Sequence, residues 1–135
     1  MDTIRLDREI DAVAHLTAIT TAGELPSRSL LVVFTDDDAM PVLAVGIDDV
    51  PVDPPQHARF QALRPLLHLG AGHGYGGALL AVARRGDPRA QGGDLAWHDA
   101  FATTTRNAGL ACHGTYVVTP AGIRRVRPRR GTVAA

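Results

Sequence analysis

Residues 78–95 read ALLAVARRGDPRAQGGDL, and this stretch decides how the middle of the chain is expected to fold. It starts with six apolar residues, Ala78 to Ala83, a short run that is typical of a buried strand. Gly86-Asp87-Pro88 then predicts a turn, because all three residue types favour turn conformations. Asp94 is a good helix cap, and a helix is expected from Leu95 to Ala108. The stretch therefore predicts a strand, a turn and a helix in succession.

The residues before this stretch predict a helix and a hairpin. Apolar side chains at helical spacing favour a helix over residues 4–22, with Gly23 as its C-terminal cap. Two apolar runs at 30–34 and 41–47 flank the polar triplet Asp36-Asp37-Asp38, which is typical of a β-hairpin. The first run has no polar alternation, so it predicts a strand that is covered on both faces.

A proline-rich connector at residues 48–55 leads into a second predicted helix, because proline is well accommodated in a first helical turn. Its core-facing residues are expected to be Phe60, Leu63, Leu66 and Leu67, and Pro65 is expected to kink or divide it. The glycine-rich residues 70–77 leave this helix and enter the next strand, whereas a dinucleotide-binding loop does the reverse. We therefore predict a flexible connection there.

The C-terminal part predicts two more strands. Gly109 is a candidate C-cap, 116–118 a strand, and 123–126 a short edge strand after the turn at 119–122. The resulting order, α-β-β-α-β-α-β-β, predicts an α+β fold in which helices pack on one mixed sheet. We expect one domain over residues 1–135, with an N-terminal helix in 1–23, a core at 24–127 and a frayed basic tail at 128–135.

Composition narrows the class of protein. Hydrophobic residues make up 45% of the 135 residues, which argues against general disorder. No segment approaches the roughly 20 apolar residues of a membrane span, and the first residues do not resemble a secretory signal. Cys112 is the single cysteine, so an internal disulfide is excluded and a small buried hydrophobe is expected. These features predict a soluble cytoplasmic protein, and the complete absence of lysine suggests a GC-rich bacterial genome.

The two halves of the chain carry opposite charge. Residues 1–53 hold 11 acidic residues and 3 arginines, a net charge of −8, while residues 54–135 hold 3 acidic residues and 11 arginines, a net charge of +8. Such segregation favours head-to-tail association or an anionic partner, unless the halves neutralise each other in the fold.

Gly86-Asp87-Pro88, followed by Asp94-Leu95, resembles the sequence after the metal ligands in RadC-type JAB/MPN domains. The resemblance covers residues 24–127 and implies that family's order of a hairpin, a helix, a strand leading to the metal motif, a helix and a late strand. Residues 30–51 and Trp97-His98 also resemble uncharacterised domains of GC-rich bacteria, which carry no known activity.

The resemblance implies a zinc site formed by two histidines and an aspartate, with a serine and an upstream glutamate assisting catalysis. Only the aspartate is retained, as Asp94; the histidine positions hold Ala81 and Ala83, and the serine position holds Gln91. Arg28 and Ser29 stand near the glutamate position. Because alanine cannot bind a metal, we expect no catalytic residue, no metal and no cofactor.

The leading hypothesis is therefore a non-catalytic binding or scaffold domain, a pseudoenzyme with a degenerate metal site. The former cleft is expected to accept an anionic ligand or a partner's peptide, and exposed sheet edges are expected to pair with a protein partner or a second copy. The candidate cleft residues are Arg84, Arg85, Asp87, Asp94 and His98.

One alternative is a hydrolase with a rebuilt metal site. Asp94 and His98 are one helical turn apart, and His113 follows in a later strand, so these three side chains are the candidate ligands. Serine and cysteine hydrolases are disfavoured, because neither serine lies in a nucleophile elbow and Cys112 and His113 are expected to face opposite sides of a strand.

The other alternative is a nucleic-acid accessory protein. Five arginines fall within seven residues, a density suited to phosphate contacts, but no aromatic residue is interleaved for base stacking. A solvated tail, or one that pairs with an acidic neighbouring subunit, remains open. These candidates are Arg124, Arg125, Arg127, Arg129 and Arg130.

Overall fold

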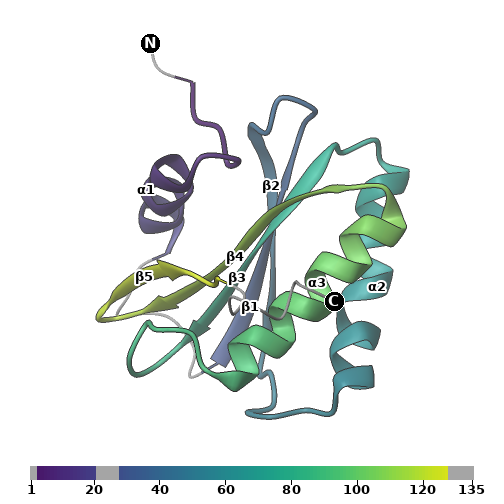
Figure 1. Ribbon diagram of the computed structural model, residues 1–135. Helices are drawn as coiled ribbons and strands as arrows, with labels where there is room; N and C mark the ends of the chain where they lie inside the picture. The colour runs from purple at the N-terminus through teal and green to yellow at the C-terminus, as the bar shows by residue number, and fades with distance from the viewer. Residues whose placement is uncertain (1–2, 21–27, 128–135) are drawn as a thin grey trace.

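The computed structural model describes residues 3–20 and 28–127, and it confirms the predicted α+β class with one mixed sheet (Figure 1). The order of elements is also the predicted one. The helices are α1 (Glu9–Ile19), α2 (Gln56–Gly72) and α3 (Gly92–Ala108), and the strands are β1 (Arg28–Thr35), β2 (Pro41–Asp48), β3 (Gly77–Arg84), β4 (Ala111–Thr119) and β5 (Gly122–Arg125).

The five strands are arranged in the order β2-β1-β3-β4-β5. β1 is antiparallel to both β2 and β3, β3 is parallel to β4, and β5 returns antiparallel to β4. The parallel pair needs a crossover, which α3 provides. β2 and β5 are therefore the two edges of the sheet.

Helices cover both faces of this sheet. α2 and α3 lie on one face and α1 lies on the other (Figure 1). All eight residues of the central strand β3 are consequently buried, and β1 is also largely buried on both faces. This explains why the apolar runs of these strands lack polar alternation.

α2 begins after Pro55, as predicted, and buries Leu63 and Leu67 in the core. Pro65 does not divide this helix, which continues to Gly72. Gly70 is required for its packing: a Cβ atom there would lie 2.2 Å from a ring carbon of Phe34. Within residues 3–20 and 28–127, no helix combines the length and the apolar composition needed to span a membrane.

Three local predictions need correction. The first helix starts at Glu9 rather than residue 4, because Leu6 is buried and its N–H binds the carbonyl oxygen of Ala39 instead. The predicted end of that helix, at residues 21–23, lies outside the described residues. Cys112 is exposed: it pairs with Ala78 of β3, but β5 pairs only with residues 116–119, so this end of β4 has a neighbouring strand on one side only.

The third correction concerns α3. Asp94 is not the N-cap: the helix begins at Gly92, Gln91 is the cap residue, and Asp94 is the third helical residue. Its carboxylate accepts a hydrogen bond from the backbone N–H of Gln91 at 2.8 Å, the part that an acidic residue plays in a capping box. Gly109 is the C-cap, as predicted, with a left-handed φ of 79°.

Candidate functional site

A buried ion pair joins the end of β3 to the start of α3. Arg84 Nε donates to Asp94 Oδ1 at 3.1 Å, and Arg84 Nη2 donates to Asp94 Oδ2 at 2.7 Å. Both side chains are only 2% exposed. Such a bidentate arrangement is the strong form of a guanidinium–carboxylate contact.

The remaining donors of Arg84 are also used within the protein. Nη1 donates to the carbonyl oxygen of Arg85 at 3.0 Å, and Nη2 donates to that of Arg89 at 3.1 Å. The guanidinium therefore stabilises the turn that Gly86-Asp87-Pro88 predicts. Asp94 holds Arg84 and the Gln91 N–H at once, so its oxygen atoms already have partners.

The structure does not gather the five predicted cleft residues around one opening. Arg84 and Asp94 lie in the interior and neutralise each other, whereas Arg85 and Asp87 are exposed on the following loop. His98 lies further along α3, with Nδ1 2.9 Å from Thr115 Oγ1 on β4.

The positions that the resemblance assigns to the metal site lie mostly in packed surroundings. Ala81 and Ala83 are buried on the face of β3 that α1 covers. Ser29, which is also buried, pairs with Ala83 across β1 and β3. Gln91 is exposed at the start of α3. Nothing in this set offers a cation two free ligands.

The alternative site formed by Asp94, His98 and His113 is contradicted. His113 Nε2 lies 2.9 Å from Thr35 Oγ1, at the opposite end of β4 from the Arg84–Asp94 pair. Burial lowers the pKa of both His98 and His113, which favours neutral imidazoles. Each imidazole is hydrogen-bonded to a threonine hydroxyl. In the part of the chain that the structure describes, no three His, Cys, Asp or Glu residues are grouped closely enough to hold a metal ion.

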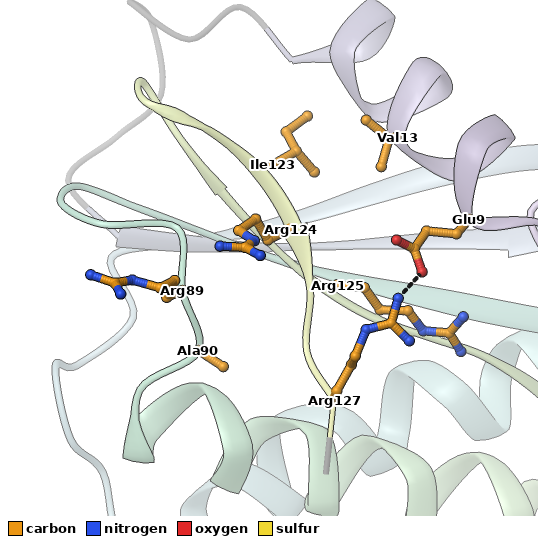
Figure 2. A pocket seen from close by; sticks show the side chains of 8 residues that line it. All are labelled: Glu9, Val13, Arg89, Ala90, Ile123, Arg124, Arg125 and Arg127. Atoms are coloured by element: carbon orange, nitrogen blue, oxygen red, sulfur yellow. Dashed lines mark hydrogen bonds and ion pairs between the residues drawn. The ribbon is translucent and has the colours of Figure 1, made fainter. Parts of the chain in front are cut away.

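A cavity of about 330 Å³ lies where β5, α1 and the β3–α3 loop meet (Figure 2). We call it the basic groove, because its lining includes four arginines and a single acidic residue, Glu9. Val13 and Ile123 supply an apolar wall. The arginines are Arg89 from the loop, Arg124 and Arg125 from β5, and Arg127 just beyond β5.

Asp87, at one end of the groove, is bound by Arg89 and is also influenced by the charge of Arg124. Arg89 Nη2 donates to Asp87 Oδ2 at 2.8 Å, and the Arg89 backbone N–H donates to Oδ1 at 2.8 Å. These hydrogen bonds, with a smaller contribution from the charge of Arg124, lower the pKa of Asp87 to about 2. Arg89 therefore binds this carboxylate directly, whereas Arg124 adds only a weaker electrostatic attraction.

Glu9, at the other end of the groove, is paired with one arginine. Arg127 Nη2 donates to Glu9 Oε1, which ties the C-terminal end of the described chain to α1 (Figure 2). Arg125 lies against Gly114, whose backbone has a φ of +104°, and a Cβ atom there would lie 3.1 Å from its guanidinium. Within residues 3–20 and 28–127, neither Arg124 nor Arg125 forms a salt bridge.

A buried hydroxyl lies close to the Arg127–Glu9 pair. The Tyr116 side chain is fully buried, and its hydroxyl has no hydrogen-bond partner among the residues that the structure describes. Burial raises its pKa, while the charges of Arg125 and Arg127 oppose that rise and Glu9 adds to it. The tyrosine is therefore a neutral donor that is near the charged groups of the groove.

The sequence identified only part of this groove. Arg124, Arg125 and Arg127 belong to the predicted arginine cluster, while Arg129 and Arg130 lie outside the described residues. Arg89 and Glu9 were missed, because no local pattern shows that they meet the C-terminal arginines in space. The opposite charges of the two halves were the available signal, and the Glu9–Arg127 pair shows that the halves partly neutralise each other.

No protein-family model matches the chain, and no curated protein is significantly similar to it in sequence. The resemblance to RadC-type JAB/MPN domains therefore stays a prediction. The functional argument depends on the geometry of the Arg84–Asp94 pair and of the basic groove.

Proposed function

We propose that this protein is a non-catalytic binding domain with a JAB/MPN-like fold and a degenerate metal site. The observation that carries this proposal is the buried Arg84–Asp94 pair. The one metal ligand that the resemblance retains, Asp94, is already bound to the guanidinium of Arg84. Its carboxylate is therefore neutralised by a side chain of the protein and not by a zinc ion.

Two further observations support the proposal. The order of β1, β2, α2, β3, α3 and β4 is compatible with the order that the resemblance implies. Ala81 and Ala83 stand on the strand that would carry the histidines, and both are buried without a polar atom in the side chain. Ser29 lies beside Ala83, where the resemblance would require a catalytic glutamate.

Elemental analysis tests whether the protein has lost its zinc site. The full chain is purified without chelators, incubated with excess zinc chloride, dialysed and measured for zinc per chain. We expect far less than one zinc per chain. One zinc per chain, lost in Asp94→Ala but kept in Asp87→Ala, would overturn the proposal.

The binding role is assigned to the basic groove rather than to the buried pair. The groove is open to solvent, and its four arginines outnumber the carboxylates of Glu9 and Asp87. This surplus favours an anionic ligand, because opposite charge steers association and guanidiniums bind carboxylates or phosphates.

A nucleic-acid accessory role is the second candidate, and the convergence of Arg89 with the β5 arginines favours it. Removal of residues 124–135 is a poor test, because it would also remove half of β5. Point substitutions in the groove keep the sheet intact, and they are used in the experiment below.

A further inference from the structure

We propose that the basic groove binds a ligand with at least two neighbouring phosphate groups, one held by Arg89 and Arg124 and the other by Arg125 and Arg127. This inference rests on the proposed anion-binding function and adds the class of ligand. It depends on how the four guanidiniums are divided around the edge strand β5.

The arginines form two sets, and each set has one carboxylate. Arg89 binds Asp87, and Figure 2 shows Arg124 on the same side of β5 as Arg89. Arg127 binds Glu9, and Figure 2 shows Arg125 on the same side of β5 as that pair. Each set therefore keeps a surplus of one positive charge, and each carboxylate marks a place where a negative group is already stabilised.

Phosphate fits these sets better than a single carboxylate does. A phosphate group has enough oxygen atoms to accept hydrogen bonds from two guanidiniums at once, whereas a carboxylate has only two oxygen atoms, which a single guanidinium fork can occupy. Residues 124 and 125 are successive in β5, so their side chains leave opposite faces of the strand. A ligand that satisfies both must pass around this edge with a negative group on each side.

The Arg127–Glu9 pair must open for the second phosphate to bind Arg127. Glu9 then acts as an internal competitor, because the ligand must displace its carboxylate from Arg127. Removing that negative charge is expected to strengthen binding.

The groove recognises phosphate rather than bases. Among the described residues, its lining contains no aromatic side chain for the base stacking that usually accompanies single-strand binding. Neighbouring phosphates occur both in a nucleic-acid backbone and in free polyphosphate, and the two sources are separated by testing each one.

The experiment measures fluorescence anisotropy of a labelled twelve-residue oligothymidylate with the full chain at several salt concentrations. Inorganic tripolyphosphate is used as an unlabelled competitor. The variants are Arg89→Gln, Arg124→Gln and Glu9→Gln. Arg64→Gln is the matched control, because Arg64 is an exposed arginine on α2, which lies on the other face of the sheet from α1.

We expect Arg89→Gln and Arg124→Gln each to weaken binding about fivefold and to reduce the salt slope by about 0.7, the value for one lost phosphate contact on a single strand. Glu9→Gln is expected to tighten binding about threefold, and Arg64→Gln to change nothing. Competition by tripolyphosphate at micromolar concentration would identify free polyphosphate as sufficient, whereas competition only at millimolar concentration would identify the nucleic-acid strand as the source.

Two results would overturn the inference. The first is no binding of either probe at low salt. The second is a loss of binding that is the same for Arg64→Gln as for the groove variants. In both cases a chain without zinc would still leave the non-catalytic proposal standing, so failure of the two proposals can be told apart.

Discussion

The Arg84–Asp94 pair and the Arg127–Glu9 pair use the same two chemical groups in opposite settings. The first is 2% exposed on both sides, whereas in the second Arg127 is 69% exposed and Glu9 44%. In the interior, each charge depends on the other because water cannot replace a lost partner. At the surface water is a ready substitute, so the partner can be exchanged for a ligand. The comparison indicates that burial separates the structural arginine from those that we propose to bind a ligand.

The largest expected effect comes from removing one member of the buried pair. Arg84→Met should lower the free energy of unfolding by about 3–5 kcal/mol, because it leaves the Asp94 carboxylate buried without a counter-charge. Urea unfolding followed by circular dichroism measures this change. Arg64→Met, on an exposed part of α2, is the matched control and should stay close to the parent.

The double replacement Arg84→Met with Asp94→Leu sharpens the result. If the cost is that of an unpaired charge, the double variant should regain part of the stability that Arg84→Met loses. A single variant within 1 kcal/mol of the parent, roughly the median for surface ion pairs, would show that the buried pair behaves like a surface pair and would break the comparison.

The next effect is a dependence of stability on pH that comes from buried imidazoles and not from the exposed loop. Burial lowers the pKa of His98 below 6.5; the charge of Asp99 opposes this shift, and that of Arg125 adds to it. Burial also lowers the pKa of His113, although the charge of Asp7 opposes this shift. The unfolded chain therefore binds protons more readily, and stability should fall as the pH drops below about 6.5.

Asp87 behaves differently: its pKa is lowered from 3.8 to about 2, so any contribution it makes is lost only as the pH falls through that acid range.

Urea unfolding at pH 7.5, 6.5 and 5.5 separates these two contributions. His98→Gln keeps a polar partner for Thr115 but cannot titrate, so its stability should depend less on pH than that of the parent. The exposed His68 provides the control, and His68→Gln should follow the parent curve. Identical slopes for His98→Gln and the parent would show that the His98 imidazole does not resist protonation in the fold.

The sequence predicted the parts of this molecule that depend on local patterns. The hairpin of β1 and β2, the start of α2 after Pro55 and the cap at Gly109 all follow from residues close together in the chain. The class of fold followed from the order of these elements. Asp94 was also identified as a former metal-ligand position from local spacing, because it follows Gly86-Asp87-Pro88 at a fixed distance.

Contacts between distant residues were not predictable in the same way. Asp94 was expected to cap a helix, and nothing in the sequence indicated that Arg84 would turn back to bind it across the turn. Glu9 and Arg127 are 118 positions apart, so only the fold brings them together. Cys112 was predicted to be buried from its residue type, but its exposure depends on how far β5 extends along β4.

The smallest expected effect tests the exposed side of the comparison. Asp87→Asn removes the charge that Arg89 binds but keeps an oxygen that can accept the Arg89 backbone N–H, so the turn should persist. The urea midpoint is expected to match the parent within error, whereas the affinity of the basic groove for phosphate should rise, because Arg89 no longer has a competing carboxylate. Parallel unfolding and anisotropy measurements on one preparation check both results. A clear loss of stability without any gain in affinity would mean that Arg89, like Arg84, serves the fold, and that exposure alone does not make an arginine available to a ligand.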